Sequence, residues 1–149
     1  MTPITTWWMA QGPRLQSLLR IVAAYIFILA GSMKLFGWPM GMPPDNSTAQ
    51  LWTQVWFGGV LETFGGALLL VGLWTRPVAF VLAGEMAVAY WQFHAGATPA
   101  FPTMNNGVGA VIFCFVWFYF SAAGAGAWSL DALRGRARGS GAMGLGRGR

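Results

Sequence analysis

The chain has 149 residues, which suits one domain better than two. Hydrophobic residues make up 56% of it and charged residues only 9%, against roughly 25% in a soluble globular domain. This composition excludes an ordinary water-soluble protein and favours a membrane protein. The net charge of +5 does not indicate nucleic-acid binding, because five of the nine basic residues lie in the last sixteen positions.

Four apolar segments are predicted to cross a membrane as α-helices: residues 15–36, 51–73, 77–93 and 107–123. Each is close to the ~20 residues that a helix needs to span a ~30 Å hydrocarbon core. A helix satisfies its own backbone hydrogen bonds, and none of the segments alternates apolar and polar residues as a transmembrane strand does. We therefore predict an all-α, antiparallel bundle of four transmembrane helices over residues 15–133.

The connections agree with this arrangement. Residues 74–76 are so short a link that the second and third helices must lie side by side and antiparallel, and Pro77 suits the first turn of a helix. Residues 37–50 and 95–106 are rich in proline, asparagine and other turn formers, and they are expected to be irregular loops.

The basic residues predict the orientation. With four spans, both termini and Arg76 lie on the same side of the membrane, together with Arg14 and Arg20. The other side has only Lys34 and the acid Asp45. By the positive-inside rule, both termini are cytoplasmic, in a multi-pass protein of the bacterial inner membrane.

The two ends are assigned separately. Residues 1–14 are predicted to be a cytoplasmic or interfacial segment. Residues 134–149 are mostly glycine and arginine, with too little apolar surface to offset the entropy of ordering, so we expect a disordered tail. Its arginines suit anionic lipid headgroups, and membrane lipid is favoured over RNA as their partner.

Two acids lie in the middle of predicted spans, Glu62 in the second and Glu85 in the third. An ionised carboxylate at the centre of a bilayer costs on the order of 2.5–3.5 kcal/mol, so each must be paired, protonated or exposed to water. Arg20 and Lys34 in the first span are fourteen residues apart, which places them within roughly 40° on one helix face. This face is expected to point into the bundle.

Depth along the helices suggests partners for these charges. At ~1.5 Å per residue from Arg76, Glu85 lies ~13 Å deep and Glu62 ~21 Å deep. We predict that Arg20 lies nearest Glu85 and that Lys34 lies nearest Glu62; a tilt of the helices would exchange these pairings. The charges then form either a site for protons or a polar headgroup, or structural ion pairs that fix helix packing.

His94 is the only histidine and ends the third span. It is either a proton donor or ligand at the mouth of the bundle, or an interfacial polar residue that ends a helix. Cys114 is the only cysteine, so the sequence predicts no disulfide, thiol pair or metal site. No residue is assigned as catalytic. The candidate intramembrane site for a quinone or for protons is Arg20, Lys34, Glu62, Glu85 and His94.

Three ordered motifs resemble the DoxX family of small bacterial four-helix membrane proteins. They are LLRIVAAYIFILAGSMKLFG in the first span, LETFGGALLLVGLWTRPVAFVLAGEMAVAYWQFH over the second and third, and GAGAWSLDALR after the fourth. No single motif is specific, but their order and spacing together are. One position departs from the family pattern: Val108 follows Asn106-Gly107, where family members commonly carry an acid.

The resemblance implies a redox-associated function. Family members are described as the small membrane subunit of a thiosulfate:quinone oxidoreductase, or as part of a membrane complex that handles oxidative stress. The sequence has no pair of haem-ligating histidines, cysteine cluster or nucleotide-binding glycine loop. Any electron carrier would therefore be a quinone or belong to a partner redox subunit, while the chain could also form a homo-oligomer.

Two other functions compete with this one. In the first, the chain is a non-catalytic structural or assembly subunit of a larger membrane complex, and its buried charges are structural pairs. In the second, it is a transporter of protons or a small solute. The transporter is the weakest alternative, because the spans are neither broken nor arranged as inverted repeats.

Overall fold

The computed structural model describes residues 2–96 and 100–144, with side chains as far as residue 137. All regular structure in these residues is helical, apart from one isolated bridge between Met42 and Ser47, so the all-α prediction is confirmed. The α-helices are α1 (Pro3–Ala10), α2 (Gly12–Phe36), α3 (Gln54–Val60), α4 (Gly66–Val71), α5 (Thr75–Ala89), α6 (Val108–Ala123) and α7 (Leu130–Gly144). Two π-helical turns, η1 (Leu61–Gly65) and η2 (Tyr90–His94), continue α3 and α5.

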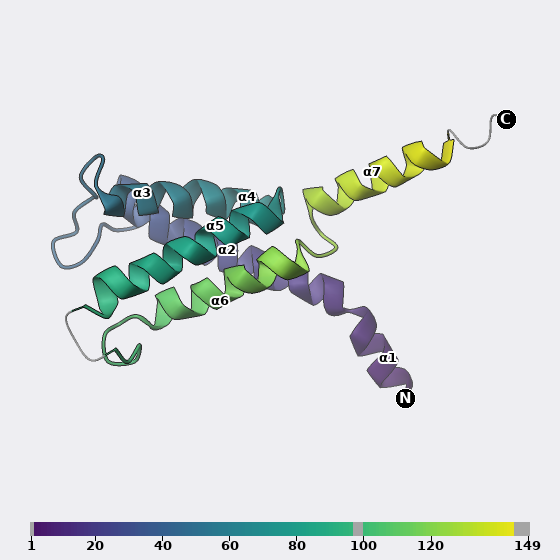
Figure 1. Ribbon diagram of the computed structural model, residues 1–149, viewed down its shortest axis with the longest axis horizontal. Coiled ribbons are helices and arrows are strands. Elements are labelled where there is room, and N and C mark those ends of the chain that lie inside the picture. Colours follow the sequence, from purple (N-terminus) through teal and green to yellow (C-terminus); the bar gives the residue numbers. More distant parts are fainter. Residues whose placement is uncertain (1, 97–99, 145–149) are drawn as a thin grey trace.

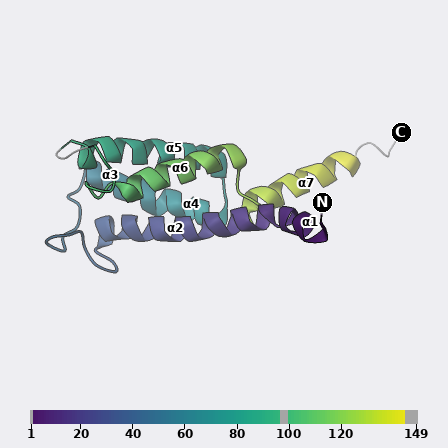
Figure 2. The ribbon, with the colours of Figure 1, turned by 90° about the horizontal axis from the view of Figure 1, so that it is seen from below.

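The long helical segments lie side by side (Figures 1 and 2). They are α2, the α3–η1–α4 segment, the α5–η2 segment and α6, and they alternate in direction along the chain. The tight turn between α4 and α5 marks one end, which we call the turn end. The helices α1 and α7 project beyond it, whereas residues 37–53, 95–96 and 100–107 lie at the opposite, loop end.

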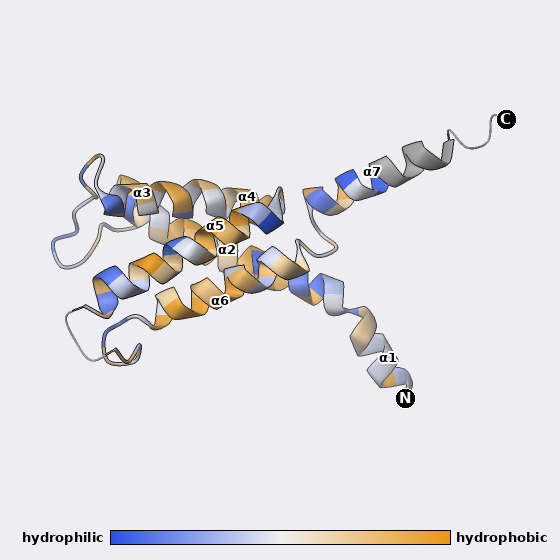
Figure 3. Ribbon diagram, viewed as in Figure 1, coloured by the Kyte–Doolittle hydropathy of each residue, from blue (hydrophilic) through white to orange (hydrophobic). Residues whose placement is uncertain are grey.

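Among the described residues, two helices are long and apolar enough to cross a membrane by length and composition alone. They are Gly12–Phe36, with a mean hydropathy of 1.8, and Gln54–Val71, with 1.4. Val108–Ala123 is apolar but shorter. Figure 3 shows hydrophobic residues distributed along all the packed helices. Many large apolar side chains are exposed on these helices, including Phe64, Phe80 and Phe115, as expected where helices contact lipid.

Glycines allow α2 to approach the α3–η1 segment closely. A Cβ atom added to Gly31 would lie 2.6 Å from the backbone nitrogen of Thr63 and 2.8 Å from the carbonyl oxygen of Gly59. A Cβ added to Gly59 would lie 3.0 Å from the Cβ of Lys34. Small residues at such crossings are typical of membrane helix pairs. The crossing places Lys34 directly against the second helical segment.

The apolar core lies where α2, α5 and α6 meet. Phe27 of α2 and Trp117 of α6 are buried, with ring centroids 5.3 Å apart in an edge-to-face arrangement. Leu82 of α5 and Phe120 of α6 are also buried. The helices end at residues suited to stopping them, since Gly37 after α2 and Gly72 after α4 both adopt left-handed backbone conformations.

The C-terminal tail differs from its prediction over residues 134–144. These residues belong to α7, where the sequence predicts disorder, and residues 145–149 lie outside the described part of the chain. Ser129 accepts a hydrogen bond from the backbone N–H of Ala132 at 3.1 Å, and Asp131 lies in the first turn. Both features favour the start of a helix. The prediction of disorder rested on the low apolar content of the tail and did not consider these residues at the start of the helix.

Candidate functional site

A cavity of about 940 Å³ brings together four of the five predicted site residues. Lys34, Glu62, Glu85 and His94 all line it, and we call it the Glu62–Glu85 cavity. The other residues that line it are mostly apolar and come mainly from α2, α3, η1, α5, η2 and α6, with Met42, Pro43 and Asn106 from the loops. They include Phe27, Ala30, Phe57, Leu61, Val81, Met86, Val88, Phe93, Ala110 and Phe113.

An ion pair lies at the polar part of this cavity. The Nζ of Lys34 is 2.6 Å from Oε1 of Glu62, to which it donates a hydrogen bond. The side chain of Glu62 is only 3% exposed, whereas that of Lys34 is 26% exposed. The prediction that Lys34 lies nearest Glu62 is confirmed. The close approach of α2 at Gly59 explains it, because it brings the lysine within reach of the second segment.

Glu85 reaches the same place from α5. It interacts electrostatically with both Glu62 and Lys34. One oxygen of each carboxyl group, Oε2 of Glu62 and Oε2 of Glu85, is buried without a hydrogen-bond partner among the described residues. Buried polar atoms are nearly always hydrogen-bonded in proteins. Two carboxyl groups and one amino group therefore line the cavity, and each carboxyl group has one buried oxygen that remains unsatisfied among the described residues.

Two of the polar residues of the cavity lie on wide helical turns. Glu62 belongs to η1 and His94 belongs to η2. Such π-helical turns are rare and occur frequently at functional sites. The sequence contains no pattern that distinguishes them from ordinary α-helix, so the prediction of continuous spans missed them.

His94 lies at the loop end of the cavity. Its Nδ1 is 3.0 Å from the carbonyl oxygen of Asn105, and its ring stacks on Tyr90 with centroids 6.4 Å apart. The hydroxyl of Tyr90 donates a hydrogen bond to the carbonyl oxygen of Ala100 at 3.0 Å. These contacts hold the imidazole between η2 and the segment before α6. The position agrees with the predicted mouth of the bundle, while the role of His94 stays a prediction.

Arg20, the fifth predicted site residue, does not line this cavity and lies toward the turn end. Its side chain is fully buried, and its guanidinium donates hydrogen bonds to four backbone carbonyl oxygens. Two acceptors belong to α4 and two to the segment between α6 and α7. They are Leu69, Leu70 at 2.7 Å, Ala125 at 2.8 Å and Trp128 at 2.5 Å.

The prediction that Arg20 lies nearest Glu85 is therefore wrong. The acid that acts on Arg20 electrostatically is Asp131, whereas Glu85 interacts with the ion pair in the cavity. The last carbonyl groups of a helix have no donor within that helix and form the negative end of its dipole. A buried arginine near the end of α4 is satisfied by these groups. The depth of a residue along its span can match a charge with an acidic side chain, but it does not identify backbone carbonyl groups as partners.

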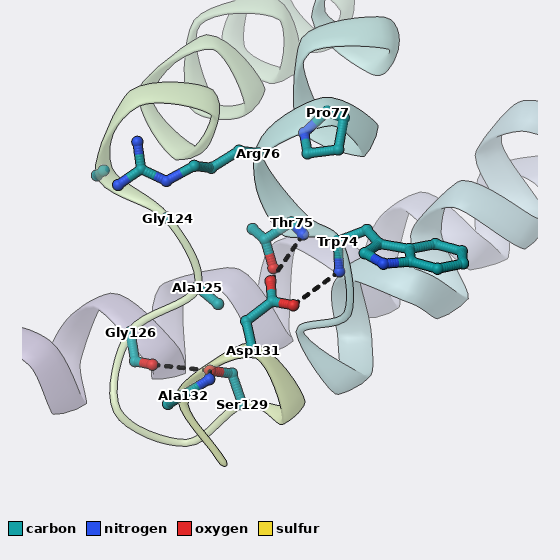
Figure 4. Close-up of a pocket in the computed structure, with 11 residues that line it drawn as sticks. Trp74, Thr75, Arg76, Pro77, Gly124, Ala125, Gly126, Ser129, Asp131 and Ala132 are labelled. Atoms are coloured by element: carbon teal, nitrogen blue, oxygen red, sulfur yellow. Dashed lines mark hydrogen bonds between the residues drawn. The ribbon is translucent and has the colours of Figure 1, made fainter. Parts of the chain in front are cut away.

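Asp131 completes a second polar cluster at the turn end (Figure 4). Its two carboxylate oxygens accept hydrogen bonds from the backbone N–H groups of Trp74 and Thr75, each at 2.9 Å. It thus caps the start of α5 from the start of α7. A hollow of about 430 Å³ beside it is lined by residues of the α4–α5 turn and by residues 123–126. We call Arg20, Asp131 and their backbone partners the turn-end cluster.

The described residues contain no group of three or more histidine, cysteine, aspartate or glutamate side chains that could hold a metal ion. The Glu62–Glu85 cavity combines polar groups with apolar walls. Its carboxyl and ammonium groups can hydrogen-bond a polar ring, and its apolar walls can enclose hydrocarbon.

Comparisons with known proteins agree with the resemblance seen in the sequence. The sequence model of the DoxX family matches residues 15–95, which is more than half of the chain and includes all five predicted site residues. An uncharacterized protein of Haemophilus influenzae is 39% identical over 121 residues, covering 80% of this chain and 90% of the relative. No solved structure matches the chain.

Proposed function

Because the chain belongs to the DoxX family, a family of membrane proteins, we propose that it is a small subunit or partner of a quinone-linked redox system. The system would oxidise sulfur compounds or handle oxidative stress, as the resemblance implies. The observation that carries the proposal is the Glu62–Glu85 cavity, which combines unsatisfied buried carboxyl oxygens with apolar walls.

The residues of the cavity fit a quinone headgroup. A quinone presents two carbonyl oxygens on a flat apolar ring, and its reduced form presents two hydroxyl groups. The ammonium group of Lys34 can donate to a carbonyl oxygen, and the carboxyl groups of Glu62 and Glu85 can accept from a hydroxyl. The aromatic side chains of Phe27 and Phe113 supply apolar contact for the ring.

A bound quinone would supply the redox chemistry, since its reduction takes up two electrons and two protons. The chain contributes hydrogen bonds, exclusion of water and places to hold protons. Among the described residues Lys34 forms its ion pair with Glu62 Oε1, and Glu85 has no ion pair. The carboxyl group of Glu85 can therefore hold a proton beside the headgroup. His94 lies where a proton could pass between the cavity and the loop end.

We further propose that the four packed helical segments each span the inner membrane, with both termini cytoplasmic. The excess of arginines at the turn end and the exposed apolar side chains on each packed helix support this topology. Reporter fusions after residues 45, 76 and 149 would test it. Periplasmic signal from the first fusion and cytoplasmic signal from the other two are expected.

Quinone binding is tested with protein purified into lipid nanodiscs. We expect retained quinone in an organic extract of the wild type, and a loss of about tenfold or more in affinity for Glu85→Gln and Lys34→Met. Asp45→Asn is a matched control, because this acid is exposed in the loop of residues 37–53. Wild-type protein that binds no added quinone would refute the proposal.

The structural or assembly role stays the alternative, and one observation favours it in part. The guanidinium of Arg20 donates to backbone carbonyl oxygens of separate segments, as expected of a residue that fixes helix packing. A stable partner that co-purifies in fixed stoichiometry, together with full function of Glu85→Gln in a deletion strain, would favour this alternative over quinone binding.

A further inference from the structure

We propose that the Glu62–Glu85 cavity opens sideways into the membrane between α3 and α5, and that its ligand enters there with an apolar tail lying between these helices. The inference rests on the proposed function and specifies its substrate class. The ligand is a membrane-dissolved quinone with a long hydrocarbon tail, not a water-soluble ring compound.

The first observation is that α3 and α5 do not pack closely together. On the second helical segment, α5 packs against η1 and α4, which lie nearer the turn end. Toward the loop end α5 diverges from α3 (Figure 1), and the cavity extends between them. The wider π-helical turn η1 lies between α4, which packs against α5, and α3, which diverges from it.

The second observation is that the residues on both sides of this separation are apolar and exposed. On the α3–η1 side, Phe57 is 49% exposed and Leu61 is 37% exposed. On α5, Val81 is 52% exposed and Val88 is 47% exposed. All four also line the cavity. A side chain that faces both the cavity and the surroundings lies at an opening, and apolar side chains there suit an opening into hydrocarbon.

The third observation concerns the glycines. A Cβ atom added to Gly31 or Gly59 would meet a neighbouring helix at 3.0 Å or less, so these glycines serve helix packing. A Cβ added to Gly84 would meet nothing within 4 Å, and one added to Gly58 would meet only Oε1 of Glu85, at 3.4 Å. Both line the cavity. Packing does not require glycine at these two positions, and the absence of side chains there leaves space beside Glu85.

The fourth observation is that the loop end is bridged. The side-chain amides of Gln54 in α3 and Gln92 in η2 form a hydrogen bond across this end. Met42 and Pro43 of the first loop also line the cavity there. His94 is held to the carbonyl oxygen of Asn105. A ligand that comes from the loop end must pass these contacts, whereas one that comes from the side passes between apolar side chains.

The test compares two probes on protein in lipid nanodiscs: ubiquinone with its full isoprenoid tail, and duroquinone, which has no tail. Gly84→Phe places a ring in the proposed opening. It should weaken binding of the tailed quinone by about tenfold or more while changing duroquinone binding by less than about threefold. Gly12→Phe is the matched control, since a Cβ there also meets nothing within 4 Å and Gly12 does not line the cavity. It should leave the binding of both probes unchanged.

A photoreactive group on the quinone tail gives a second measurement that needs no substitution. Labelling of peptides that contain Phe57, Val81 or Val88 supports the side opening, and it decides the question even if Gly84→Phe does not fold. Labelling confined to residues 37–53 would overturn the inference, as would unchanged binding of the tailed quinone by folded Gly84→Phe. If wild-type protein binds neither probe, the proposed function itself fails.

Discussion

Replacing Arg20 with alanine should destabilise the fold strongly, and this result should not depend on Glu85. The guanidinium is fully buried and serves four carbonyl oxygens that join α2 to α4 and to the segment before α7. Its removal leaves those oxygens without their charged donor in a place that water reaches poorly.

The magnitude follows from these contacts. The carbonyl oxygen of Leu69 keeps a second donor, the N–H of Gly72 at 3.1 Å. Most of the lost hydrogen-bond energy therefore comes from the other three acceptors. A hydrogen bond from a charged donor stabilises a protein by about 1.5–3 kcal/mol, and bonds that share one guanidinium are not additive. We therefore expect Arg20→Ala to lower the free energy of unfolding by about 3–5 kcal/mol.

Intrinsic tryptophan fluorescence during thermal and chemical unfolding in detergent measures the effect. Arg14→Ala is the matched control, because Arg14 is exposed and donates a hydrogen bond to the side chain of Gln11, only three residues earlier. The double variant Arg20→Ala, Glu85→Gln distinguishes the two assignments of Arg20. If Arg20 neutralised Glu85, the second change would restore stability; recovery of most of the loss would refute the carbonyl assignment.

Three further changes test other parts of the structure. Lys34→Met should cost about 3–5 kcal/mol by leaving Glu62 buried without its partner, and adding Glu62→Gln should recover most of that loss in the same unfolding assay. Gly31→Ala should cost about 1–3 kcal/mol because its Cβ would contact the neighbouring backbone, whereas Gly84→Ala should be nearly neutral; equal effects would contradict the packing. Asp131→Ala should cost about 1–2 kcal/mol by uncapping α5, and faster hydrogen exchange at the start of α5 would report it.

The parts of the structure that follow from local rules could be predicted from the sequence. Apolar runs indicated the helices, and helical spacing with depth identified the Lys34–Glu62 pair. The partner of Arg20 could not be predicted in the same way. Backbone carbonyl groups have no signature in a sequence, and those near Arg20 come together only once the segment of residues 124–129 folds over the start of α2.

The cavity was only partly predictable for a related reason. Its polar residues were identified one by one, because a charge in a membrane span is conspicuous. Its shape depends on where two helices stop touching, and that depends on the π-helical turn at Glu62 and on the glycines at positions 58 and 84. The glycine pairs of the second span all appear alike in the sequence. Only the structure separates those that pack helices from those that leave an opening.

The two charges of α2 show how one helix face serves two purposes. Arg20 and Lys34 share a face, yet they lie fourteen residues apart, or about 21 Å along a helix. Arg20 joins the helices at the turn end by donating four of its five N–H groups to backbone carbonyl oxygens. Lys34 binds a single carboxylate oxygen and remains partly exposed within the cavity. Arg20 thus joins the helices at the turn end, while Lys34 lies with Glu62 and Glu85 in a cavity whose walls are otherwise mostly apolar.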